Sequence, residues 1–199
     1  SIQFYMVGGV DSIQSDFYYN GMQNFNDLHA LWNTNSVPNA INIYIVDVLH
    51  LDGNYFCGYS AFSWQQAQGI AIDNSCMPPV DMGILPHEVG HYFDLFHTHE
   101  TAFAVEYVNG SNCTSAGDKL CDTAADPGLS YTTVNGGCQY IGGQVDPLGS
   151  SYNPDARNYM SYSRHECINH FSPQQQAKAL ATLINIRPSL AHSSLPGSD

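Results

Sequence analysis

Residues 87–97 read HEVGHYFDLFH, and this stretch decides how the rest of the chain is interpreted. On a helix, His87 and His91 project from the same face because they are four residues apart, and Glu88 lies beside them. Two imidazoles bind Zn²⁺ well, and a third ligand would leave one coordination position for water. A carboxylate beside that water can accept its proton. The stretch therefore predicts a catalytic zinc site with Glu88 as the general base.

The third zinc ligand has three candidates in the sequence. His97 follows His91 by six residues, Asp94 follows it by three and Glu106 by fifteen. Three residues are less than a helical turn, which disfavours Asp94, and Glu106 would need a second helix that the surrounding sequence does not cap strongly. We expect His97 to be the ligand, with Glu106 and Asp94 as the alternatives.

Composition narrows the class of protein. A chain of 199 residues with 43% apolar residues suits one domain over residues 1–199 with a sizeable core. Eighteen Asp and Glu against five Lys and Arg give a net charge of −13, which disfavours nucleic acid and anionic membranes as partners. No apolar run is long enough for membrane insertion. The first residues do not read as a signal peptide, so we expect a mature chain whose signal peptide or pro-segment has been removed.

Six cysteines, none of them in a CxxC pair, are typical of an oxidised, secreted protein. The alternative is a second, structural zinc site. Such a site needs closely spaced ligand pairs, which these cysteines do not offer. We therefore expect three disulfides and an extracellular location, although spacing alone leaves the connectivity open.

The first part of the chain mixes strands and helices. Residues 2–7 suit an opening strand, and 16–33 suit a surface helix. Residues 41–49, INIYIVDVL, are rich in β-branched side chains and predict a central buried strand. Residues 58–64 read as a loop and 69–72 as a short strand. These elements predict a mixed, twisted sheet.

The second part of the chain is mostly irregular. Apolar residues recur at three- and four-residue steps between positions 80 and 96, so the histidine helix is expected to pack one side on a core. Residues 109–155 are rich in Gly, Asn, Asp, Ser, Thr and Pro and need cysteines or ions to hold them. Ser172-Pro173-Gln174-Gln175 then begins a final helix with a capping box. The order indicates an α+β fold.

Three segments together resemble the pappalysin family of the metzincin clan, in its secreted bacterial form. The histidine stretch is similar to the long zinc signature of the clan. Residues 158–162, NYMSY, resemble its Met-turn, and residues 111–127, SNCTSAGDKLCDTAADP, resemble a pappalysin segment. The resemblance implies a metzincin-like, two-lobed catalytic domain. We expect an N-terminal lobe of about residues 1–97, with the active-site helix above an irregular C-terminal lobe of about 98–199.

The same resemblance implies roles for single residues. It implies a zinc-dependent endopeptidase in which Tyr162 donates a hydrogen bond to the reacting carbonyl and Met160 forms the floor of the site. It also implies the disulfides Cys57–Cys76, Cys113–Cys121 and Cys138–Cys167. One position departs from the pattern, because the clan has glycine where this chain has Asp94. Aspartate is among the few residues that tolerate a left-handed backbone, so we expect Asp94 to make the turn.

Substrate contacts and a second ion are also predicted. The resemblance suggests Glu166 as an acidic pocket floor, and hence Lys or Arg after the scissile bond. A sheet edge at Gly69, Ile70 and Ala71 is expected to bind an extended peptide or protein substrate. Oxygen-rich side chains and the family pattern predict a structural Ca²⁺. The residues predicted for this ion are Asp118, Cys121, Thr123 and Asp126, with Asp122 close by.

A protein of another class would use the same residues differently. A secreted binding or adhesion module that is catalytically impaired would hold zinc in a closed site with four protein ligands. Asp94 is the residue that raises this alternative, because an imperfect turn would misplace His97. Cleavage of a protein substrate with and without a chelator separates the two.

Overall fold

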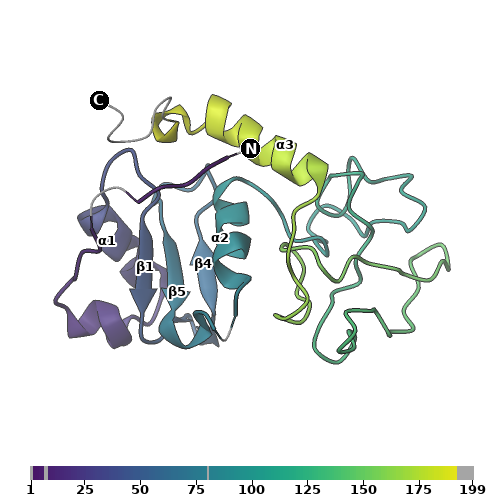
Figure 1. The fold of residues 1–199 in the computed structure, drawn as a ribbon, viewed down its shortest axis with the longest axis horizontal. Coiled ribbons are helices and arrows are strands. Elements are labelled where there is room, and N and C mark those ends of the chain that lie inside the picture. The colour runs from purple at the N-terminus through teal and green to yellow at the C-terminus, as the bar shows by residue number, and fades with distance from the viewer. Residues whose placement is uncertain (1, 7–8, 80, 192–199) are drawn as a thin grey trace.

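The computed structural model describes residues 2–6, 9–79 and 81–191 of the chain (Figure 1). A small sheet with helices α1 and α2 forms one end of the molecule, an irregular lobe forms the other, and α3 runs across the top of the view. The predicted α+β architecture is confirmed. In chain order, the elements are η1 (Phe17–Gly21), α1 (Phe25–Asn35), β1 (Ile43–Val46), β2 (His50–Leu51), β3 (Asn54–Tyr55), β4 (Gly58–Ser60), β5 (Ile70–Asp73), η2 (Asn74–Cys76), α2 (Ile84–Tyr92), α3 (Pro173–Asn185) and η3 (Pro188–Leu190).

The main sheet has three strands in the order β1-β5-β4. Strand β1 is parallel to β5, and β4 is antiparallel to it, so the predicted mixed sheet is confirmed. The sheet differs from the prediction in two segments. Residues 41–49 are predicted to be central, but β1 is an edge strand and β5 is central. Residues 58–64 are predicted to be a loop, but they begin with β4, the other edge strand.

Burial on the two faces of the sheet explains why β5, and not β1, is the central strand. Ile70 and Ile72 of β5 pack in the cluster that contains α2, whereas Ala71 packs in the cluster that contains α1. Strand β5 is therefore buried on both faces. In β1 only alternate residues are buried, and Ile43 and Ile45 are 43% and 53% exposed. β-branched residues favour a strand, but they do not reveal how many neighbours the strand has.

The predicted helix over residues 16–33 is divided in two. Asn24 caps α1 by accepting a hydrogen bond from the amide of Asp27 at 3.1 Å. Trp32 of α1 is fully buried against Gly69, where a Cβ atom would lie 2.7 Å from the indole ring. Glycine therefore allows α1 to approach the sheet. Residues 2–6 form no strand, and residue 7 of that prediction lies outside the described residues.

No helix or named strand occurs between α2 and α3, a stretch that the structure describes in full. The irregular segment predicted for residues 109–155 is therefore confirmed. Ser172 and Gln175 form the predicted capping box at the start of α3. None of the helices in the described ranges combines the length and apolarity that a bilayer crossing requires. The cysteines form the pairs that the family resemblance implies, namely Cys57–Cys76, Cys113–Cys121 and Cys138–Cys167.

Candidate active site

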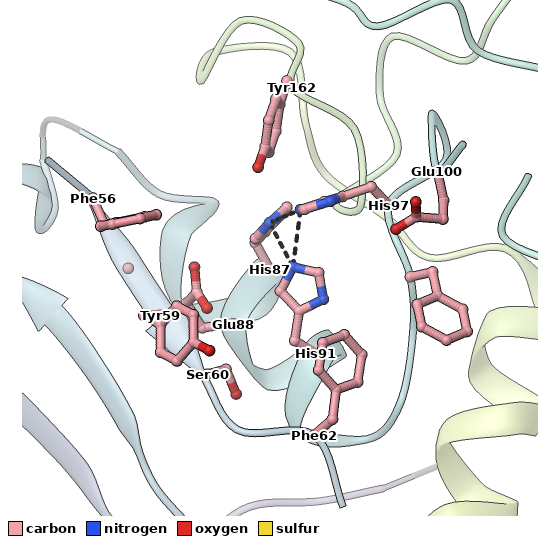
Figure 2. Close-up of a pocket in the computed structure, with 12 residues that line it drawn as sticks. Phe56, Tyr59, Ser60, Phe62, His87, Glu88, His91, His97, Glu100 and Tyr162 are labelled. Atoms are coloured by element: carbon pink, nitrogen blue, oxygen red, sulfur yellow. Dashed lines mark hydrogen bonds between the residues drawn. The ribbon is translucent and has the colours of Figure 1, made fainter. Parts of the chain in front are cut away.

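Three histidines meet at one side of α2 (Figure 2). His87 and His91 come from the helix, and His97 comes from the chain just after it. Their Nε2 atoms lie 3.0 to 3.2 Å from one another. Three ligands on one face of a tetrahedral zinc ion would be roughly 3.3 Å apart, given Zn–N bonds of about 2.0 to 2.1 Å. Among the described residues, no other three His, Cys, Asp or Glu side chains gather in this way.

The hydrogen-bond partner of each Nδ1 atom determines which ring nitrogen of the histidine carries the hydrogen. Nδ1 of His87 lies 2.6 Å from the Tyr159 carbonyl oxygen, and Nδ1 of His91 lies 2.8 Å from that of Leu95. A carbonyl oxygen only accepts, so each Nδ1 is the donor and each Nε2 of a neutral ring bears a lone pair. The Nε2 atoms of His87 and His91 are 3.1 Å apart, with no hydrogen left to bridge them. A cation between them would remove this repulsion, and carbonyl-oriented imidazoles are typical of metal sites.

Burial keeps the histidines neutral. It lowers the pKa of His87, and it lowers the pKa of His91 to about 3, with a further contribution from the charge of His87. The pKa of His97 is also well below its ordinary value, first because of burial and then because of the other two histidines. Only neutral imidazole binds a metal ion. At neutral pH, protons therefore do not compete with zinc for these nitrogens.

Glu88 lies beside the histidines and is 4% exposed. Burial raises the pKa of its carboxyl group to about 8 in the metal-free protein, and Oε2 has no hydrogen-bond partner among the described residues. A Cβ atom on Gly58 of β4 would lie 2.5 Å from Glu88 Oε1. Glycine at this position gives the carboxyl group its space. A buried carboxyl group with a raised pKa suits proton transfer at neutral pH.

Met160 lies beneath the histidine helix and is fully buried. A Cβ atom on Gly90 would lie 2.4 Å from the Met160 sulfur, so a glycine is needed for this close approach. The Met160 carbonyl accepts a hydrogen bond from the amide of Thr98 at 3.1 Å. Tyr159, the preceding residue, holds His87. The turn at residues 158–162 thus supports α2 and the segment that carries His97.

A pocket of about 210 Å³ opens over the histidines and Glu88. Strand β4 forms one wall, and Phe62 and Tyr162 lie on opposite sides of the histidine group (Figure 2). The Tyr162 ring is 4.6 Å from that of His97, and 55% of the residue is exposed. Burial raises the pKa of the phenol, and Glu88 and Glu100 raise it further. Tyr162 therefore stays a hydrogen-bond donor at neutral pH.

The model of the pregnancy-associated plasma protein-A peptidase family, the pappalysins, matches residues 23–184. The chain belongs to this family. An extracellular metalloprotease from Verticillium alfalfae is 35% identical over 107 residues, which are 51% of this chain and 30% of that protein. One from Arthroderma benhamiae is 29% identical over 148 residues, 68% of this chain and 45% of that protein. The chain thus spans less than half of either relative.

A solved structure resembles this chain in fold. Mature mirolysin from Tannerella forsythia, in complex with a cleaved peptide, superposes with a TM-score of 0.52 at 23% identity. The match covers 75% of this chain and 55% of mirolysin. At this level of identity, the likeness concerns the fold alone.

Asp94 makes the turn that pappalysins and other metzincins are expected to make with glycine. Its φ angle of 66° lies in the left-handed region. Its carboxylate accepts hydrogen bonds from the amide and hydroxyl of Ser63, both at 2.8 Å, and from the hydroxyl of Thr182 at 3.3 Å. The turn forms, and His97 reaches the other two histidines. Asp94 and Glu106, the rival ligands, both lie outside the histidine group.

The predicted substrate-binding edge is in the wrong place. Gly69, Ile70 and Ala71 are buried, and β5 is paired on both sides, so these residues cannot add a peptide strand. Strand β4 is paired with β5 on one side and lines the pocket with Gly58 and Ser60. Strand β4 was not predictable from the sequence, because its three residues carry too little periodicity to be recognised as a strand.

Glu166 is not among the residues that line the pocket. Its carboxylate pairs with the guanidinium of Arg164 at 2.7 Å, and its side chain is half exposed. Besides Glu88, the carboxyl group that lines the pocket belongs to Glu100, which was not predicted from the sequence. Glu100 follows His97 by three residues, and this proximity was the available signal.

The residues predicted for calcium are not gathered in one group. Asp118 accepts a hydrogen bond from Thr123 at 2.9 Å, whereas Asp126 accepts one from Thr98 at 2.6 Å. Within the described ranges, no three carboxylates meet there. However, Asp118 Oδ2 and Glu106 Oε2 are buried without a hydrogen-bond partner. Burial and their mutual repulsion raise the pKa of Glu106 to about 7, and burial raises that of Asp118 to about 6.

Proposed function

We propose that this chain is the catalytic domain of a secreted, zinc-dependent endopeptidase. The observation that carries the proposal is the set of facing Nε2 lone pairs of His87 and His91, completed by His97 and flanked by the unpaired carboxyl group of Glu88. Family membership supports peptide hydrolysis, and the names of the extracellular relatives support secretion. Strand β4 has an edge beside the pocket that no strand of the described residues pairs with, and such an edge suits an extended peptide.

The chain's own groups can perform the proton transfers of peptide hydrolysis. Zinc, when bound by His87, His91 and His97, would acidify a water molecule and polarise the scissile carbonyl. Glu88 accepts the proton of the attacking water and returns it to the leaving amine. Tyr162, from the far side of the pocket, donates a hydrogen bond to the developing negative charge on oxygen. Backbone groups of β4 hold the peptide extended.

Cleavage of a peptide library by the purified chain tests this function. The wild type is compared with Glu88→Gln, which keeps the side-chain shape, and with a chelated sample, while bound zinc is measured by atomic emission. We expect cleavage in the wild type only, and one zinc per chain in both the wild type and Glu88→Gln. Stoichiometric zinc without cleavage in the wild type would contradict the proposal and support the zinc-binding module. That module also requires a fourth protein ligand, and the described residues provide three.

Preference for Lys or Arg after the scissile bond is part of the proposal. Glu166 is the residue for which the family resemblance predicts this role, and Glu100 is the carboxylate that lines the pocket besides the proton acceptor Glu88. The library is therefore repeated with Glu166→Gln and Glu100→Gln. Loss of a basic preference in one variant alone identifies its source, and a wild type that shows no basic preference refutes this part.

A structural Ca²⁺ is proposed near Glu106 and Asp118. The support is the pair of buried, unpaired carboxylate oxygens, which are the ligand type that Ca²⁺ prefers. Isothermal titration of the zinc-loaded protein with Ca²⁺ tests it. Glu106→Gln should weaken binding, whereas Asp155→Asn, a change at an exposed carboxylate, should not.

Removal of a pro-segment is a further part of the proposal. It is tested by expressing the full-length gene and sequencing the N-terminus of the active protein from the culture medium. An active protein that retains its residues upstream of the catalytic domain would contradict it.

A further inference from the structure

Four aromatic side chains form a continuous surface beside the catalytic pocket. We call Phe62, Trp64, Phe96 and Phe103 the aromatic shelf. The rings of Phe62 and Trp64 are stacked with centroids 4.5 Å apart, and Phe62 and Phe96 are 5.5 Å apart. Phe96 and Phe103 meet edge to face at 5.1 Å. Trp64 is 63% exposed and Phe103 is 41% exposed, so the shelf presents apolar surface to solvent.

The shelf is continuous with the site of the proposed reaction. Phe62 and Phe96 line the catalytic pocket, and the Phe62 ring lies 5.3 Å from that of the histidine His91. Figure 2 shows Phe62 below His91, on the side opposite Tyr162. Exposed apolar surface that joins a reaction pocket is typical of a binding site for part of the substrate.

The shelf is held in a defined position. Ser63 lies between its two stacked rings in the sequence, and the Asp94 carboxylate accepts hydrogen bonds from both the amide and the hydroxyl of Ser63. The aspartate that replaces the clan's glycine therefore connects the shelf to the turn that delivers His97. A fixed aromatic surface loses little conformational entropy when it binds an apolar group.

Two cations cover ring faces of the shelf. Lys178 Nζ lies 4.6 Å from the Phe96 centroid, and Lys119 Nζ lies 3.2 Å from that of Phe103. These are two of only five Lys and Arg residues in the chain. Their charge would repel a basic side chain at this place, although the net charge of the chain is −13.

We propose that the aromatic shelf is a subsite for a large aromatic or apolar side chain of the substrate, two to four residues before the scissile bond. The inference rests on the proposed peptidase function and extends it to specificity. A peptide on the free edge of β4 would pair antiparallel, the slightly more stable arrangement, so its earlier residues lie toward the C-terminal end of β4. Phe62 and Trp64 follow Ser60 by two and four residues, and an extended peptide advances about 3.3 Å per residue.

The first test is the cleavage profile of the zinc-loaded protein on a peptide library. We expect Phe, Tyr, Trp or Leu to be enriched two to four residues before the cut, with Lys and Arg depleted there. Trp64→Ala should lower the ratio of kcat/KM for Phe-containing over Ala-containing peptides by roughly five- to tenfold, as expected for one aromatic contact. Tyr19→Ala removes a similarly exposed aromatic residue, on η1, and should leave the ratio unchanged.

The second test does not depend on cleavage. Of the two tryptophans, Trp32 is fully buried and Trp64 is exposed, so a change in tryptophan emission reports on the shelf. Octapeptides of alanine and serine that carry a single Phe, Ala or Lys at each position are titrated into Glu88→Gln. Tighter binding of a Phe peptide, with an emission change that Trp64→Phe greatly reduces, supports the subsite.

The outcomes separate the two proposals. Equal binding of the Phe and Ala peptides, or enrichment of aromatic residues only after the cut, would overturn the aromatic subsite even if cleavage occurs. Absence of cleavage together with selective binding of Phe peptides would overturn the peptidase function and leave the shelf as a peptide-binding surface.

Discussion

Replacing Asp94 by glycine restores the residue expected for the metzincin clan, and we predict that it destabilises this protein. Glycine removes the cost of a left-handed backbone, which is about 1 kcal/mol for a non-glycine residue. It also removes the carboxylate that accepts two hydrogen bonds of 2.8 Å from Ser63 and one of 3.3 Å from Thr182. Asp94 itself is 6% exposed, so water replaces these bonds poorly.

The magnitude follows from these contacts. Each short hydrogen bond to a buried carboxylate stabilises the fold by about 1.5 kcal/mol or more, so losing the two from Ser63 costs about 3 kcal/mol. Relief at the backbone offsets about 1 kcal/mol of that loss. Glycine also makes the unfolded chain more flexible, by a few tenths of a kcal/mol to about 1 kcal/mol. We therefore expect Asp94→Gly to lower the free energy of unfolding by about 2 to 3 kcal/mol.

Urea unfolding of chelated protein, followed by far-ultraviolet circular dichroism, measures this change. Asp94→Asn is the matched control, because asparagine tolerates the left-handed backbone and retains one acceptor oxygen. It should lose less stability than Asp94→Gly. If Asp94→Gly is as stable as the wild type or more stable, the hydrogen bonds to Ser63 and Thr182 do not stabilise this turn and our reasoning is wrong.

Other predictions concern the proton acceptor and the buried acids. Gly58→Ala places a Cβ atom within 2.5 Å of Glu88 Oε1, so we expect kcat to fall by about tenfold or more while zinc content is unchanged; a normal kcat would refute the steric argument. The raised pKa values of Glu106 and Asp118 mean that the folded protein binds protons more tightly than the unfolded one. Their stabilisation is complete below about pH 4 and is lost as pH rises through about 6 and 7, by the order of a few kcal/mol. Urea unfolding of the chelated wild type and of Glu106→Gln at pH 5 and pH 8 measures how much unfolding free energy each protein loses between the two pH values. The buried histidines act in the opposite direction in both proteins, so the difference between the two losses isolates the effect of Glu106. Equal losses in the two proteins would contradict the prediction.

The site was largely predictable because the three histidines and Glu88 all lie within residues 87–97. Four-residue spacing on a helix brings His87 and His91 together whatever the rest of the fold does. Positive φ at Asp94 followed from the family resemblance, which implies a left-handed turn there, together with the tolerance of aspartate for that conformation. The cap of α3 was predictable for a similar reason, because Ser172 and Gln175 satisfy backbone groups within one turn.

The order of the strands could not be read in the same way. Residues 41–49 have the composition of a buried strand, yet Ile43 and Ile45 are exposed because α2 covers β5 and does not extend over β1. Which strand is central depends on contacts between segments far apart in the sequence. The calcium prediction met the same difficulty. Asp118 interacts electrostatically with Glu106 and forms no group with Asp126 among the described residues, because the irregular lobe brings residues together without periodicity.

Asp94 shows how a departure from a family pattern can acquire a use. Glycine at this position serves only the backbone, because it has no side chain to offer. Aspartate serves the backbone at a small cost, and its carboxylate binds Ser63 between two rings of the aromatic shelf and Thr182 on α3. Hydrogen bonds therefore connect the turn that positions the third histidine to the proposed subsite. If that connection matters, Asp94→Gly should weaken the preference for aromatic residues in the fraction of molecules that remain folded, and Asp94→Asn should retain more of it.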